Sequence, residues 1–207
     1  MLHRLIAQGE HQQQDFKYEI SDVRKIARTL SAFANTDGGR LLIGVKDNGK
    51  IAGVRSDEEI YMVEAAASLY CVPPVECTMS IHRVEGHNVV IAEVSPSEAR
   101  PVRARLDDDS LCAFMRIADE NIVASPVQMA LWREADRDSG TLLPFTAREH
   151  SLLQLLAEAE EPLTLNRFAR LGRLPRHRAV QLLVQFIRFG LVEQRFVGHT
   201  FVYVPVE

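Results

Sequence analysis

The sequence predicts an α+β protein with two domains, and three observations lead to this prediction. The chain has 207 residues, and because domains commonly hold about 100 to 200 residues, it can form one large or two small domains. Strand-like and helix-like apolar patterns are mixed in the first two thirds of the chain. The last third instead shows helical segments followed by short strands, which indicates a second domain.

In the first domain, residues 12–18 read as a short strand, and Ser21 is expected to cap the helix that follows. That helix carries one apolar face, which we expect to pack on a sheet, and it ends at Gly38-Gly39. The apolar run 41–45 then predicts a buried strand. Residues 51–54 are its expected hairpin partner across Asp47-Asn48-Gly49.

The remaining elements of this domain follow from apolar periodicity and from turn residues. A helix is expected from Asp57 to about Tyr70, where prolines interrupt it. A last helix is expected from Pro126 to about Ala135, with Ser125 as its cap. Between them we expect a hairpin and a single strand, at residues 78–84 with 87–94 and at 111–117.

A polar, glycine-containing stretch, 138–144, is the expected linker, which gives domains at 1–137 and 145–207. After it, helices are expected at 146–158, 166–171 and 175–189, and short strands at 191–195 and 199–204. Three helices followed by a terminal hairpin form the plan of a winged helix-turn-helix domain.

Composition and charge exclude several classes of protein. No apolar run approaches the roughly 20 residues that span a bilayer, and the N-terminus lacks the apolar core of a secretory signal, so we expect a cytoplasmic protein without membrane contact. Cys71, Cys77 and Cys112 lack zinc-site spacing and are odd in number, so we expect buried, reduced thiols.

The formal net charge of −4 argues against a surface that coats nucleic acid everywhere. From Phe145 to the end, however, eight arginines accompany six glutamates, a balance of +2. Basic charge is therefore concentrated in the last third of the chain.

Five ordered motifs in the first domain resemble one family. They are Gly9-Glu10, Asp15-Phe16-Lys17, Ala32-Phe33-Ala34-Asn35-Thr36-Asp37-Gly38-Gly39, Leu42-Ile43-Gly44-Val45 and Asp47-Asn48-Gly49-Lys50-Ile51-Ala52-Gly53. Together they resemble the Schlafen/AlbA-type (AlbA_2) domain. The resemblance implies a mixed α/β domain that binds nucleic acid and is often followed by a winged helix. Bacterial members often carry the label ATP-binding.

The resemblance also implies an enzymatic alternative. In eukaryotic Schlafen members, three acidic residues form the site of a metal-dependent ribonuclease, and the matching positions here are Glu10, Asp15 and Asp47. Clustered carboxylates of this kind hold Mg²⁺ or Mn²⁺ at a scissile phosphate. Asp15 stands where the family usually has Glu. The other interpretation is that all three are solvated turn carboxylates, with Lys17 pairing one of them.

Two interpretations also remain open for the glycine turn. Backbone N–H groups in such a turn can cradle a phosphate, but Gly38-Gly39 follows a helix, whereas phosphate-binding glycines normally precede one. A helix C-cap followed by entry into a strand explains both residues, and we favour this interpretation. ATP is therefore expected only through the family label.

Basic residues supply the candidate nucleic-acid contacts. In the second domain, the helix from Pro175 presents an expected recognition set with two residues at the wing turn, namely Arg176, His177, Arg178, Gln181, Arg195 and His199. In the first domain, Lys17 and a cluster of Arg100, Arg103, Arg105 and Arg116 can meet phosphates, or the cluster is a solvated charged loop.

Our leading hypothesis is a nucleic-acid-binding protein, most simply a homodimeric, DNA-binding transcriptional regulator. The first alternative is a metal-dependent endoribonuclease that uses Glu10, Asp15 and Asp47, with Lys17 holding the RNA backbone. The second is a protein-interaction module, because winged helices also dock protein partners.

Overall fold

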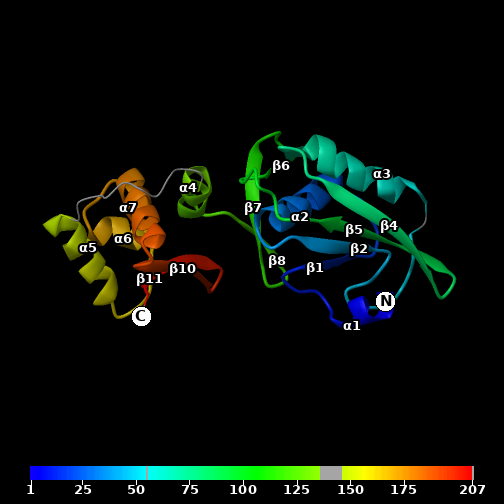
Figure 1. Ribbon diagram of the computed structural model, residues 1–207, viewed down its shortest axis with the longest axis horizontal. Coiled ribbons are helices and arrows are strands. Elements are labelled where there is room, and N and C mark those ends of the chain that lie inside the picture. The colour runs from blue at the N-terminus through cyan, green and yellow to red at the C-terminus, as the bar shows by residue number, and fades with distance from the viewer. Residues whose placement is uncertain (55, 136–145, 207) are drawn as a thin grey trace. The chain divides into compact units, whose positions relative to one another are not determined.

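The computed structural model describes residues 1–54, 56–135 and 146–206 (Figure 1). It divides into two compact units, Met1–Ala124 and Ser125–Glu207. The expected linker at 138–144 lies outside the described residues. No described helix is long and apolar enough to cross a membrane.

Unit 1 contains two sheets among its described residues. The first has the order β1-β2-β5-β4, in which β1 and β2 run parallel and the other neighbours antiparallel. Its strands are β1 (Gln14–Lys17), β2 (Gly39–Ile43), β4 (Cys77–Val84) and β5 (His87–Val94). The second sheet is antiparallel and has the order β3-β6-β7-β8. Its strands are β3 (Cys71–Val72), β6 (Arg103–Arg105), β7 (Leu111–Ile117) and β8 (Glu120–Val123).

Helix α2 (Val23–Asn35) packs against strands of both sheets, so the main core forms around it (Figure 1). The sequence predicted one apolar face, but the last two turns are buried on every side, from Thr29 to Asn35. Helix α1 (Leu2–Ala7) instead packs with Phe16, Leu42 and Ile91 in a separate cluster. The expected second helix is α3 (Glu58–Ala65), which continues as a π-helical turn, η1 (Ala66–Tyr70).

Two polar side chains of α2 form hydrogen bonds with the backbone of the second sheet. Asn35 Nδ2 donates to the carbonyls of Val102 and Phe114 at 2.7 and 2.8 Å, and Asn35 Oδ1 accepts from the Val102 amide at 2.8 Å. Ser31 Oγ donates to the Val102 carbonyl at 2.9 Å and accepts from the Phe114 amide at 3.2 Å. We call Ser31 and Asn35 the helix clasp. Just beyond the last β6–β7 residue pair, the clasp bonds to Val102 and Phe114 where backbone hydrogen bonds between the two strands would otherwise form. The helix is therefore hydrogen-bonded to the sheet as well as packed on it.

The two glycines after α2 are required by packing. Gly38 has φ +70°, and a Cβ there would lie 2.7 Å from the Val94 carbonyl oxygen. A Cβ on Gly39 would overlap the Phe33 ring. The chain can therefore leave the helix and enter β2 only without side chains at these positions.

The structure corrects two local predictions. The N-cap of α2 is Asp22 rather than Ser21, since the Asp22 carboxylate accepts from the Arg24 amide at 2.9 Å. The hairpin expected after β2 reduces to a single bridge between Val45 and Ile51. Gly44, at φ +93°, turns the chain there, and its carbonyl accepts from both Ala52 and Gly53.

Unit 2 contains helices packed on a small sheet. The helices are α4 (Pro126–Glu134), α5 (Ala147–Ala157), α6 (Leu165–Leu171) and α7 (Arg176–Arg188). Strands β9 (Leu163–Thr164), β10 (Val192–Val197) and β11 (Thr200–Pro205) pair in the order β10-β11-β9. Apart from β9, which lacks a sequence signal, these elements match the expected helices and hairpin within about two residues.

Helix α4 was expected in the first domain, but it packs in unit 2. Its Val127 is fully buried in the same apolar cluster as Phe168, Leu183 and Phe186. Ser125 caps α4, as predicted, by accepting from the Gln128 amide at 3.0 Å. Ser125 Oγ also donates to Gln194 of β10 at 2.7 Å, which ties the start of α4 to the hairpin.

The helix clasp supplies a stability test. We expect Asn35→Ala to lower the free energy of unfolding by about 2–5 kcal/mol, because it leaves buried backbone groups of Val102 and Phe114 without partners. Urea denaturation measures this change. Asn48→Ala, in an exposed turn, is the matched control and should change stability by less than about 0.5 kcal/mol. Equal effects of the two substitutions would contradict the role of the clasp.

Candidate functional site

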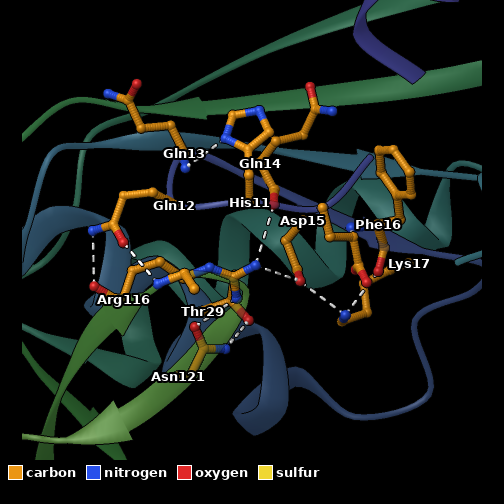
Figure 2. Close-up of polar contacts among 12 residues, drawn as sticks. His11, Gln12, Gln13, Gln14, Asp15, Phe16, Lys17, Thr29, Arg116 and Asn121 are labelled. Atoms are coloured by element: carbon orange, nitrogen blue, oxygen red, sulfur yellow. Dashed lines mark hydrogen bonds and ion pairs between the residues drawn. The ribbon is translucent and has the colours of Figure 1, made fainter. Parts of the chain in front are cut away.

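A buried ion pair joins the two sheets of unit 1 (Figure 2). Asp15 lies on β1 and is 4% exposed, and Arg116 lies on β7 and is 1% exposed. Arg116 Nη2 contacts Asp15 Oδ1 at 3.1 Å and also donates to the Gln14 carbonyl at 3.2 Å. On the outer side, Lys17 Nζ lies 2.8 Å from Asp15 Oδ2. Asp15 therefore has a cation at each carboxylate oxygen.

Further polar contacts hold Arg116 in position. Its Nη1 donates to Asn121 of β8 at 3.0 Å, and Asn121 in turn donates to Thr29 of α2 at 2.9 Å. The guanidinium also lies over the Phe33 ring, 5.4 Å from its centre. Arg116 is thus fixed by groups from β1, β8 and α2, and it is not exposed for a ligand phosphate.

Gln12 supports the same junction from the surface. Its Nε2 donates to the Arg116 carbonyl at 2.8 Å (Figure 2) and to Asp37 at 3.1 Å, and its Oε1 accepts from the Ala118 amide at 2.9 Å. One side chain therefore links the start of β1, the turn after α2 and the β7–β8 turn.

Glu10 approaches the ion pair but is held differently. Its Oε1 accepts from the Phe16 amide at 2.9 Å. Partial burial raises the pKa of the Glu10 carboxyl, the Phe16 hydrogen bond opposes this shift, and the negative charge of Asp15 raises the pKa further. Glu10 and Asp15 therefore lie close enough for their carboxyl groups to interact.

Asp47 does not join them, because it is exposed in the turn that follows Gly44. In the part of the chain that the structure describes, no group of three or more His, Cys, Asp or Glu side chains is arranged to hold a metal. Arg116 and Lys17 already neutralise Asp15, so a divalent cation would have to displace both of them. The residues present do not fit the metal centre of a Schlafen-type ribonuclease.

The basic cluster expected around Arg103 and Arg116 is divided between two faces of the second sheet. Arg103 pairs with Ala113 in the β6–β7 register. Since side chains alternate along a strand, Ala113 and Arg116 point to opposite faces. Arg103 is half-buried on the outer face, whereas Arg116 faces α2.

The expected recognition residues of unit 2 are all exposed. Arg176, His177 and Arg178 form the first turn of α7, and Gln181 follows one turn later. Arg176 donates to Asn166 of α6, and Arg178 donates to Gln181 Oε1 at 3.3 Å. At the hairpin, Arg195 pairs with Glu193 on β10. His199 lies in the β10–β11 turn, with its ring edge-on to Phe196.

Glu149 holds Arg178 and was missed in the sequence. Its Oε2 accepts from the Thr146 amide at 2.8 Å, which forms a capping box at the start of α5. Its Oε1 lies 3.7 Å from Arg178 Nη2. The spacing Thr-x-x-Glu is a sequence signal for the cap, but the contact with Arg178 requires the tertiary structure.

The cysteines provide no reactive thiolate. Burial raises the pKa of Cys71 to about 12 and that of Cys77 to about 11, and it also raises the pKa of Cys112. All three are free thiols, although only Cys71 is fully buried.

Comparison with known families assigns unit 1. The family model described as Schlafen, AlbA_2 matches residues 10–125, which is more than half of the chain. The chain belongs to the Schlafen AlbA_2 family. This family is associated with nucleic-acid binding, and its match covers all the strands and helices of unit 1 except α1.

One solved structure shares the fold, and a second shows a weaker similarity. The DIP2311 protein from Corynebacterium diphtheriae has a TM-score of 0.50 and 17% identity, and the match covers 92% of this chain. It covers only 34% of that protein, so this chain spans about a third of its length. The N-terminal domain of an ATP-dependent DNA helicase RecG-related protein from Nitrosomonas europaea has a TM-score of 0.40 and 20% identity, over 51% of this chain and 81% of that one. No curated protein matches this chain.

The Asp15–Arg116 pair of the AlbA_2 domain gives a second stability test. We expect Arg116→Met to destabilise the domain by about 3–5 kcal/mol, because Asp15 then remains as a buried charge without its main partner. The double variant Asp15→Asn, Arg116→Met should recover part of this loss. Urea denaturation of the two single variants, Asp15→Asn and Arg116→Met, and of the double variant measures the coupling, and strictly additive effects would contradict it.

Glu10 makes stability depend on pH. Because its pKa is raised above its ordinary value of 4.5, the folded state favours the protonated form, so its contribution is present below that value and is lost as pH rises. We expect Glu10→Gln to raise the melting temperature at pH 7 and to have little effect below pH 4.5. Glu98→Gln, at an exposed carboxylate, is the control. The same shift at both pH values would exclude this account.

Proposed function

We propose that the chain binds DNA as a transcriptional regulator, with unit 2 as a winged helix-turn-helix domain. Helices α5, α6 and α7 precede the β10–β11 hairpin, and β9 adds a short third strand to it. Gly172 lies between α6 and α7, where a Cβ would come within 2.7 Å of Leu152. In this arrangement α7 is the helix that enters a major groove.

The charge at the N-terminus of α7 is the observation that carries the proposal. Three basic side chains, Arg176, His177 and Arg178, occupy the first turn, and no acidic residue accompanies them. A helix N-terminus already carries partial positive charge, so cations there cost stability, typically about 0.3–1 kcal/mol each. These positive side chains therefore lower the stability of the helix, but they favour the binding of an anionic ligand at its N-terminus.

The side chains of this turn also suit base contacts. Arg178 and Gln181 are already joined through Gln181 Oε1, which leaves the Gln181 amide N–H groups as donors. Arginine donors match the two acceptors of guanine in the major groove. Arg195 and His199 on the hairpin are then placed for phosphate contacts, which fix position rather than sequence.

The AlbA_2 domain supports a nucleic-acid role for the whole chain. Its carboxylate pair does not support the ribonuclease alternative, because Asp15 is neutralised by Arg116 and Lys17. We therefore assign DNA contact to α7 and an assembly role to the AlbA_2 domain.

Salt-dependent binding tests this proposal. The full chain should bind a mixed-sequence DNA duplex in fluorescence anisotropy, with affinity that falls steeply as NaCl rises. Changing Arg176 and Arg178 together to Ala should weaken binding and reduce the slope of log K against log [salt] by about 2. The melting temperature should stay the same or rise, since these cations oppose the helix dipole.

A charge-matched control distinguishes specific from general effects. Arg4→Ala with Lys25→Ala removes the same charge from exposed positions of unit 1, away from β4, and should leave binding within about twofold. Absence of DNA binding by the wild type would contradict the proposal, and equal loss in both double variants would contradict the role of α7. Tighter binding of a matched RNA duplex would overturn the choice of DNA.

A further inference from the structure

Strand β4 forms an outer edge of the first sheet in the AlbA_2 domain (Figure 1). All eight of its residues pair with β5 on the inner side, from Cys77 opposite Val94 to Val84 opposite His87. Among the described residues, no strand pairs with its other side.

The register shows which backbone groups point outward. The Asn88 carbonyl accepts from Val54, away from β4, so Asn88 and its opposite residue Arg83 form a non-hydrogen-bonded pair. Because such pairs alternate along an antiparallel ladder, the residues with outward N–H and C=O groups follow directly. They are Cys77, Met79, Ile81 and Arg83.

This edge has few of the features that prevent an edge strand from pairing with a strand of another molecule. Between Cys77 and Val84 there is neither proline nor glycine, and the basic residues His82 and Arg83 lie only near the hairpin end. Ile81 is 57% exposed at the middle of the strand. A long, regular edge with an exposed apolar residue is a template for pairing with another strand.

We propose that β4 pairs antiparallel with β4 of a second copy of this chain, about a two-fold axis at Ser80. In this register Met79 lies opposite the partner's Ile81, and Cys77 lies opposite the partner's Arg83. All four outward residues then exchange hydrogen bonds with the second copy. A shift of two residues in either direction would leave one of the four outside the ladder, so this register satisfies the most backbone groups.

Side-chain chemistry agrees with the register. Glu76, exposed just before β4, lies opposite the partner's Val84 and diagonal to the partner's His82, which places a carboxylate beside an imidazole. The two-fold axis repeats this contact at both ends. No like charges lie directly opposite one another. The pairing does not depend on DNA binding by α7.

Molar mass tests the proposal. Size-exclusion chromatography with light scattering should give twice the chain mass for the wild type. Ile81→Pro should give a single chain mass and still unfold cooperatively, because proline is tolerated where the N–H points off a sheet edge. The matched control is Val123→Pro on β8, where the Ala124 amide bonds to Ala113 and the N–H of Val123 therefore points outward. It should remain dimeric.

A crosslink tests the register. Ser80 lies opposite its own copy in a non-hydrogen-bonded pair, at a Cα separation of about 4.5 Å, which a disulfide can bridge. Ser80→Cys should form a covalent dimer on mild oxidation, whereas Ser68→Cys, also exposed, should not. A wild type that stays monomeric at every concentration overturns the proposal. A dimer that survives Ile81→Pro also overturns it, as does failure of Ser80→Cys to crosslink.

Discussion

The structure of the AlbA_2 domain depends on the helix clasp, Ser31 and Asn35. These side chains bond to the backbone of Val102 and Phe114, about 70 and 80 residues further along the chain. Apolar packing alone specifies the position of α2 less sharply, because the hydrophobic effect is non-directional. The clasp fixes one axial position and one rotation, since its donors and acceptors match the strand backbone only there.

The buried ion pair follows from that placement. Once α2 is fixed, Phe33 and Thr29 lie where the Arg116 guanidinium and Asn121 need them, and Arg116 reaches Asp15 on the opposite sheet. Burial of two charges is costly, and only close pairing with further hydrogen bonds compensates for it. Asp15, with a cation at each oxygen, is therefore part of the framework of the domain.

Local signals predicted much of the fold, and long-range contacts account for most of the differences. The Ser125-Pro126 cap, strand β7, the β4–β5 hairpin and helix α7 each carry their signal within a few residues. At Gly44 the predicted hairpin was wrong, because the positive φ of this residue depends on Lys17 and Gly53, which contact it from other segments. Likewise, Arg103 and Arg116 were expected in one cluster, because the sequence of neither strand reveals the register in which β6 pairs with β7. Asp47 and Glu10 match their motif in order, but the motif does not fix the distance between them.

Glu149 has a consequence for ligand discrimination. Its carboxylate is a built-in anion beside Arg178, held there by the cap at Thr146. A phosphate or base edge that engages Arg178 has to compete with this intramolecular partner, so weak or badly aligned anions gain less than they would from a free guanidinium. If α7 contacts DNA as we propose, Glu149, the third residue of α5, lowers the affinity of α7 for anions in general and so favours well-aligned ligands.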